Sequence, residues 1–220
     1  MTTDAFGHLR YVVVEGPIGV GKTTFASRLA DHIGGDILLE APEENPFLER
    51  FYLEGPPMAL PTQLYFLFQR SRQFQALKQG DLFRPRIVAD FMVQKDPLFA
   101  RINLDNDALA LYQQVFDKVT MEAPVPDLVI YLQASVEQLQ ERIKKRDRKE
   151  ERNIDPLYLQ RLSDAYTEFF YHYDESPLLI VNTGGLDLAE GEEDFRLLMG
   201  RIGQTLHGKH YFNPMPLLLG

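Results

Sequence analysis

Near the start of the sequence, residues 16–23 have the types and spacing that bind a nucleotide's phosphates. They match the pattern G-x-x-x-x-G-K-[ST], whose glycines let backbone N–H groups approach phosphate oxygens closely. Lys22 would meet the β- and γ-phosphates with a point charge, and the Thr23 hydroxyl would bind Mg²⁺. A plain glycine-rich turn is the alternative, but this loop also lies between an apolar run and a helical pattern. The residues expected to hold ATP with Mg²⁺ are Gly16, Pro17, Ile18, Gly19, Val20, Gly21, Lys22, Thr23 and Thr24.

Two carboxylates follow short apolar runs. Glu40 comes after 37–39, in a strand that we expect beside the one leading into the phosphate loop, where it could take a proton from an attacking hydroxyl. A phosphate-bearing acceptor would require a cation there, so Glu40 favours an alcohol acceptor; a solvated glutamate opening an acidic loop is the alternative. Asp90 comes after 87–89, where phosphate-loop enzymes often place a carboxylate near Mg²⁺; the alternative is an Asp that caps the next turn. Thr23 and Asp90 are therefore the expected metal ligands.

Positive charge is concentrated between 142 and 152. Arg142 and Arg146 share one face of a predicted helix, and Arg148 follows near the end of that helix. Such a group could close over ATP as a lid and neutralise charge on the transferring phosphoryl oxygens. The alternative is a solvated helix face, because acidic residues interleave with the basic ones.

Alternating patterns along the chain predict the elements that must position these residues. The predicted strands are 11–14, 37–39, 87–89, 128–132 and 178–181, and the predicted helices include 24–33 and 61–79. Ser135 with Gln138 forms a capping box, and Asp155 followed by Pro156 marks another helix start. The alternation predicts one α/β domain over 1–220, a doubly wound parallel five-stranded sheet of the P-loop kinase type with a helical lid. Ligands of such sheets bind beyond the carboxyl ends of the strands.

Composition excludes several classes of function. The net charge of −9 argues against a nucleic acid polymer as partner, which would require a broad basic face. No apolar run approaches the ~20 residues that span a bilayer, so no membrane partner is expected. The absence of cysteine and of a signal-like start suits a cytoplasmic protein. No Asn-Lys-x-Asp occurs to bind guanine, which favours phosphoryl transfer to a small molecule over a GTP switch.

From about residue 11 to 170 the chain resembles the deoxynucleoside kinase family, which includes deoxycytidine, deoxyguanosine and deoxyadenosine kinases. The most specific match is 131–134 followed by the lid arginines and the paired glutamates at 150–151. Residues 62–65, with Arg70 shortly after them, are similar to the family's base-binding helix.

The resemblance implies a role for each matching residue. Glu40 would be the base that takes the 5′-hydroxyl proton, and Glu151 with Tyr52 would hold the 3′-hydroxyl. Gln63 would offer its amide to the base edge beside Arg70, since an amide both donates and accepts in one plane. The substrate-binding residues expected on this basis are Glu40, Tyr52, Gln63, Arg70, Asp90, Asp96, Phe99 and Glu151, and the catalytic ones are Lys22, Glu40, Arg142, Arg146 and Arg148.

One departure from the family stands at the end of the third predicted strand. The usual Glu/Asp-Arg-Ser is Asp90-Phe91-Met92 here, so a positive charge and a hydroxyl are missing and only the role of Asp90, at Mg²⁺ or the 5′-end, carries over.

The predicted function is ATP-dependent phosphorylation of a deoxynucleoside at its 5′-hydroxyl, in a homodimer as is common in the family. Arg70 and the bulky Phe66 favour a purine base over thymine. The alternatives are a nucleoside monophosphate kinase such as a thymidylate kinase, a kinase of another small alcohol, and a non-catalytic nucleotide-binding switch.

Overall fold

The protein folds around one parallel sheet flanked by helices. The computed structural model describes residues 6–79, 86–119, 124–148, 151–205 and 207–214. The strands are β1 (Tyr11–Glu15), β2 (Asp36–Leu38), β3 (Ile87–Ala89), β4 (Leu128–Gln133), β5 (Leu178–Asn182) and β6 (Lys209–Phe212), in the order β2-β3-β1-β4-β5-β6. All neighbouring strands pair in parallel. The predicted α/β doubly wound sheet is therefore confirmed.

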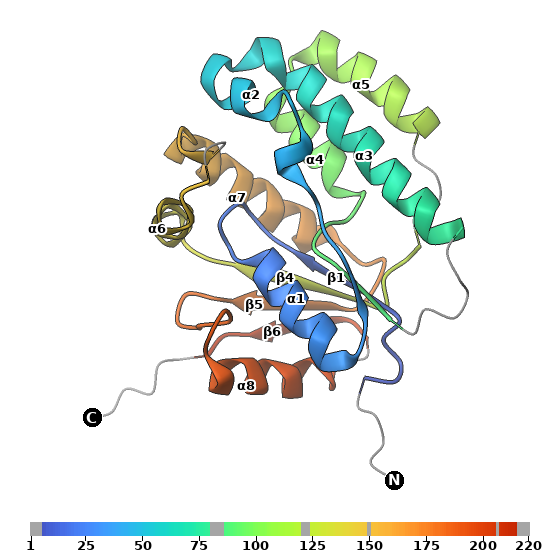
Figure 1. Cartoon of the computed structure of the whole chain (residues 1–220), viewed down its shortest axis with the longest axis vertical. Coiled ribbons are helices and arrows are strands. Elements are labelled where there is room, and N and C mark those ends of the chain that lie inside the picture. Colours follow the sequence, from blue (N-terminus) through green and yellow to red (C-terminus); the bar gives the residue numbers. More distant parts are fainter. Residues whose placement is uncertain (1–5, 80–85, 120–123, 149–150, 206, 215–220) are drawn as a thin grey trace.

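Helices cover both faces of this sheet (Figure 1). They are α1 (Lys22–Ile33), α2 (Leu48–Glu54), α3 (Ala59–Gln79), α4 (Lys95–Asn103), α5 (Asn106–Val119), α6 (Val136–Arg146), α7 (Pro156–His172) and α8 (Glu192–Ile202), with single 3₁₀ turns η1 (Pro42–Glu44) and η2 (Pro56–Met58). Successive strand residues point to opposite faces. Val12 and Val14 thus pack against α1 and α8 in one core, and Val13 packs against α3, α4 and α7 in another.

A third, smaller core joins α3, α4 and α5 above the sheet (Figure 1), through Leu67, Ala100 and Tyr112. This group of helices extends beyond the carboxyl ends of the strands, where it can enclose a ligand. Phe68 on α3 is 46% exposed and lies outside this core.

The local start signals predicted for two helices are confirmed. Ser135 accepts a hydrogen bond from the Gln138 backbone N–H, and the Gln138 side chain accepts one from Ser135 N, which completes the capping box of α6. Asp155 caps α7 with Pro156 at its first position. Both signals depend on a few neighbouring residues, so tertiary context does not alter them.

Two expectations about the sheet were wrong. The sheet has a sixth strand, β6, where five were expected. That strand lies at the sheet edge and alternates exposed with half-buried residues, so it lacks the continuous apolar run by which buried strands were recognised. The strand before Glu40, β2, is also not beside β1, because β3 lies between them. The strand order instead reverses at β1, which puts the phosphate loop at the switch point. In the described parts of the chain, no helix combines the length and apolarity needed to cross a bilayer.

Candidate active site

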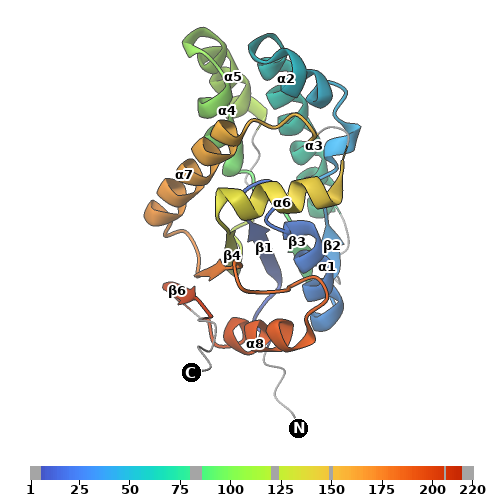
Figure 2. The same ribbon diagram turned by 90° about the vertical axis from the view of Figure 1, so that its left-hand side faces the viewer.

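The loop after β1 is shaped to wrap a phosphate. Gly16, Gly19 and Gly21 have φ angles of 149°, 85° and 102°, which side chains rarely tolerate. A Cβ on Gly19 would lie 2.7 Å from the Ile143 side chain, because α6 packs directly on the loop. Figure 2 shows α6 crossing the molecule between the sheet and the upper helices. Lid helix and phosphate loop are therefore one packed unit.

Lys22 projects along this loop from the first position of α1. Its Nζ donates to the carbonyl oxygens of Gly16 and Pro17, at 2.8 and 3.2 Å. Burial and repulsion from Lys95 lower the pKa of Lys22. These carbonyl contacts hold the ammonium over the concave side of the loop, where the phosphates of a nucleotide would lie.

Thr23 and Asp90 come together as the sequence predicts. The Thr23 hydroxyl donates to Asp90 Oδ2 at 2.6 Å, and Asp90 Oδ1 accepts from the backbone N–H of Glu40 at 2.7 Å. Hydroxyl and carboxylate oxygens are hard ligands suited to Mg²⁺, which usually binds one or two protein groups and completes its shell with phosphates and water. No cluster of three or more His, Cys, Asp or Glu in the described chain forms an all-protein metal cage. This pair fits a magnesium ion carried by the nucleotide.

The end of the pocket at which the sequence predicts the acceptor, here called the acceptor end, is a buried network of charges. Arg70 on α3 forms ion pairs with both Glu40 and Asp96, and Lys95 Nζ lies 2.9 Å from Glu40 Oε2. Burial alone would raise the pKa of Glu40, but Arg70 and Lys95 hold it below its usual range. Burial raises the pKa of Asp96 to about 6, since Arg70 only partly offsets the loss of water. Asp96, expected from the sequence among the substrate-binding residues, is thus the ion-pair partner of Arg70.

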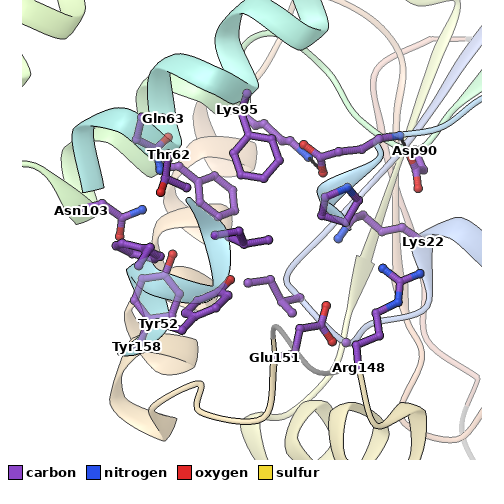
Figure 3. A pocket seen from close by; sticks show the side chains of 18 of the residues that line it. Lys22, Tyr52, Thr62, Gln63, Asp90, Lys95, Asn103, Arg148, Glu151 and Tyr158 are labelled. Carbon is purple, nitrogen blue, oxygen red and sulfur yellow. Dashed lines mark hydrogen bonds and ion pairs between the residues drawn. The ribbon is translucent and has the colours of Figure 1, made fainter. Parts of the chain in front are cut away.

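The remaining expected substrate residues line the same pocket (Figure 3). Gln63 is 3% exposed and lies at the far end from Lys22, while Tyr52 and Glu151 lie along the lower wall. Phe99 also lines the pocket, and the centre of its ring lies 6.0 Å from Lys95 Nζ. Burial, and repulsion from nearby Tyr158 and Glu151, raise the pKa of Tyr52 well above 10, so its hydroxyl stays protonated and able to donate.

The three lid arginines are placed differently from one another. Arg142 donates to Val20 O at 3.2 Å and to Thr183 Oγ1 and O at 2.9 and 2.8 Å, and it does not line the pocket. Arg146 pairs with Glu151, and Arg148 lines the pocket (Figure 3) on the side of Lys22. Positions 149 and 150 of the lid lie outside the described residues. The structure thus brings two of the three arginines to the pocket.

Sequence reasoning missed two charged residues of the site. Glu15 is fully buried at the end of β1 and accepts from Gly16 N at 3.1 Å, Met92 N at 2.9 Å and Tyr166 OH at 3.0 Å. Lys95 was not considered, although it stands beside Asp96. The position of Glu15 in the sequence could have indicated it, because Glu15 directly precedes the phosphate loop at the carboxyl end of a strand, where ligands bind.

The sequence analysis did not assign three further residues of the pocket. Tyr158 and Asn103 line it beside Tyr52, and Tyr166 also lines it. Tyr166 is buried in the core on α7. Its hydroxyl, however, also orients Glu15, a contact that helical periodicity does not indicate.

Comparisons with known proteins agree with one another. A family model described as deoxynucleoside kinase matches residues 12–207. The deoxyguanosine kinase of Bacillus subtilis (strain 168) is 28% identical over 201 residues, covering 89% of this chain and 97% of the relative. The deoxyadenosine kinase of Lactobacillus acidophilus is 29% identical over 213 residues, with 90% and 97% covered. A solved structure of deoxyadenosine kinase from M. mycoides, with products dCMP and a flexible dCDP bound, has a TM-score of 0.77 at 29% identity, covering 88% of this chain and 99% of that one.

Proposed function

The chain belongs to the deoxynucleoside kinase family, and we propose that it transfers the γ-phosphoryl group of ATP to the 5′-hydroxyl of a purine deoxynucleoside. The observation that carries this proposal is the make-up of a single pocket. Lys22 and the pair Thr23–Asp90 stand at one end of it, and Glu40 stands between them and Arg70, whose buried partner Asp96 does not itself line the pocket. A donor's phosphates and an acceptor's hydroxyl would therefore meet at Glu40.

The proposed reaction transfers one proton and one phosphoryl group. Glu40 accepts the proton of the 5′-hydroxyl as that oxygen bonds to the γ-phosphorus, and the bond from the γ-phosphorus to its bridging oxygen breaks to leave ADP. Lys22, Arg146 and Arg148 stabilise the charge on the transferring group. Because Arg70 and Lys95 both pair with Glu40, its carboxylate is a weak proton acceptor. A nucleobase that hydrogen-bonds to Arg70 would loosen the contact between Arg70 and Glu40 and so raise the basicity of Glu40.

ATP is the proposed donor, and Mg²⁺ would neutralise charge on its β- and γ-phosphates when bound. The contact between the Thr23 hydroxyl and the Asp90 carboxylate supports a metal position there. Gln63, Tyr52 and Glu151 are proposed to hold the deoxynucleoside, with Phe99 stacking on the base.

The purine preference rests on the far end of the pocket. Arg70 lies over the Phe66 ring, 5.1 Å from its centroid, so a bulky side chain narrows the space beside a desolvated charge. A thymine methyl would meet a filled, polar surface there. Relatives named deoxyguanosine kinase and deoxyadenosine kinase support the same preference. We expect deoxyadenosine or deoxyguanosine to have the highest kcat/KM, deoxycytidine an intermediate value and thymidine the lowest; thymidine as the best substrate would overturn this specificity.

One experiment tests the proposed function against its alternatives. ATP consumption is measured with the four deoxynucleosides, with dTMP, with small alcohols and with no acceptor, using Lys22→Ala as the inactive control. Turnover that depends on a deoxynucleoside supports the proposal. Turnover with dTMP alone would indicate a monophosphate kinase, and slow hydrolysis that no acceptor changes would indicate a switch.

The proposed oligomeric state is a homodimer, and the proposed location is the cytoplasm. Phe68 on α3 and Leu111 on α5 are 46% and 50% exposed, and these two helices pack side by side. A second copy covering this surface would remove both side chains from water. The absence of cysteine supports a reducing compartment. The molecular masses of the wild type and of Phe68→Glu, measured by sedimentation, test the dimer. We expect a dimeric wild type and a monomeric variant, and a monomeric wild type would overturn the proposal.

A further inference from the structure

Lys95 has no role in the reaction outlined so far, yet it is one of the most buried charges in the protein. It begins α4, and its side chain is 3% exposed. Its Nζ lies 2.9 Å from Glu40 Oε2, 3.7 Å from Glu15 Oε1 and 6.0 Å from the centre of the Phe99 ring. Figure 3 shows the side chain reaching into the pocket from the α4 side.

The hydrogen bonds of this ammonium are incomplete. An ammonium has three N–H donors, and among the described residues Lys95 donates one hydrogen bond, to Glu40. Glu15 does not depend on it, because three other donors already satisfy that carboxylate. A buried ammonium is costly unless it is paired and hydrogen-bonded. Donors left over at the wall of a pocket are therefore available to a ligand's oxygens.

Lys95 lies where the negatively charged phosphoryl group would pass during its transfer. Lys95 and Lys22 both line the pocket, and Lys95 is close enough to Lys22 that its charge helps to lower the pKa of Lys22. Glu40 attracts both of them. A phosphoryl group moving from the loop at Lys22 to a hydroxyl at Glu40 would move toward Lys95.

The neighbouring sequence explains why a lysine is needed here. Phe91 and Met92 stand where the family pattern has arginine and serine, and they are 0% and 1% exposed in the apolar core. They bring no charge to the site. Lys95, four residues after Phe91 and at the start of α4, supplies a cation at the acceptor end from a different position.

We propose that Lys95 is a catalytic residue, whose ammonium holds Glu40 toward the acceptor hydroxyl and donates a hydrogen bond to the phosphoryl group during its transfer. This inference rests on the proposed function. Lys95 keeps its three protons throughout: the hydroxyl proton goes to Glu40, the acceptor oxygen bonds to phosphorus, and the electron pair of the broken bond stays with ADP. The lysine therefore acts through charge and hydrogen bonding alone.

The chain contains no cysteine, which allows a chemical test of this charge. Lys95→Cys introduces the only thiol, and aminoethylation converts it to an analogue of lysine with the ammonium restored. Carbamidomethylation of the same thiol gives a neutral side chain of similar size. Alkylation in denaturant followed by refolding makes both forms even if the unmodified variant folds poorly. Lys209→Cys, at an exposed position of β6 away from the pocket, is treated in the same way as the control.

We expect the folded neutral form to have a kcat lower by about 10²- to 10³-fold with the nucleoside KM changed only a few-fold. The aminoethylated form should recover most of the activity, and both forms at Lys209 should equal the wild type. Equal kcat in the neutral and aminoethylated forms at Lys95 would overturn the proposal. A wild type whose ATP consumption ignores deoxynucleosides would instead overturn the proposed function, and this inference with it.

Discussion

The two ends of the pocket hold their charges in different ways. At the acceptor end, the side chains of Arg70 and Asp96 are 5% and 0% exposed, and each charge has a partner from another element. At the lid, the Arg146 side chain is 35% exposed and its partner Glu151 lies five residues along the same segment. Buried pairs with several hydrogen bonds are rigid, whereas half-exposed arginines change partners at little cost.

This difference separates two tasks of one reaction. The acceptor end is held by its own buried ion pairs, so its charges are fixed where the proposed reaction must align a proton and a hydroxyl. The lid arginines contact protein groups, Arg142 the backbone at Val20 and Thr183, and Arg146 the carboxylate of Glu151. We infer that they exchange these partners for phosphate oxygens only when ATP is present. Substitutions at the two ends should therefore have distinct signatures.

The largest effect is expected at Glu40. Glu40→Gln keeps the size of the side chain and removes the proton acceptor, so kcat should fall by about 10³-fold while nucleoside affinity changes only a few-fold. Steady-state kinetics and calorimetric titration of the nucleoside measure the two quantities. Glu43→Gln, in the exposed part of the same acidic segment, is the matched control. Equal kcat in Glu40→Gln and the wild type would move the role of base to Asp90.

The next effect is on stability and compares one arginine from each end. Arg70→Met leaves Asp96 buried without its partner, which should cost about 3 kcal/mol of unfolding free energy. Arg146→Met removes a half-exposed ion pair and should cost less than about 1 kcal/mol. Urea unfolding of both variants at neutral pH gives the comparison. Similar losses in the two variants would show that the acceptor end is no more rigidly held than the lid.

The fold and the loop were predictable because their signals are local or topological. Strands β1 and β4, the capping box of α6 and the phosphate loop each depend on a few adjacent residues. The contact of Thr23 with Asp90 joins residues 67 apart in the sequence. It was still predictable, since parallel strands end at one edge of the sheet.

The acceptor network was only partly predictable. The contact of Lys95 with Glu40 spans 55 positions, and that of Tyr166 with Glu15 spans 151. Nothing in the neighbours of Lys95 distinguishes it from a solvated lysine at a helix start, because its burial is decided by elements from other parts of the chain. The same limit hid β6, whose place at the sheet edge depends on β5 rather than on its own pattern.

A third prediction tests the lid by itself. Arg148→Gln should lower kcat by about 10²-fold, because one of the donors to the transferring phosphoryl group is lost. Its unfolding free energy should stay unchanged, since the side chain is half-exposed. Steady-state kinetics and urea unfolding of the same preparations measure kcat and the unfolding free energy separately. A loss of stability without a loss of kcat would assign Arg148 a structural role and leave Arg146 as the lid cation at the pocket.

The smallest effect is a pH dependence that only the acceptor end should show. The pKa of Asp96 is raised by burial to about 6, from 3.8, so between these values the folded protein binds a proton that the unfolded chain does not. Stability contributed by this group must then rise as pH falls through 6. The unfolding free energy of the wild type minus that of Asp96→Asn should increase by about 1 kcal/mol between pH 7 and pH 5. Glu40, Lys95 and Arg70 face Asp96 in both proteins, so their own titrations largely cancel in the difference. A difference that stays constant would mean that Arg70 keeps Asp96 ionised throughout, and the acceptor end would then be held by full charges alone.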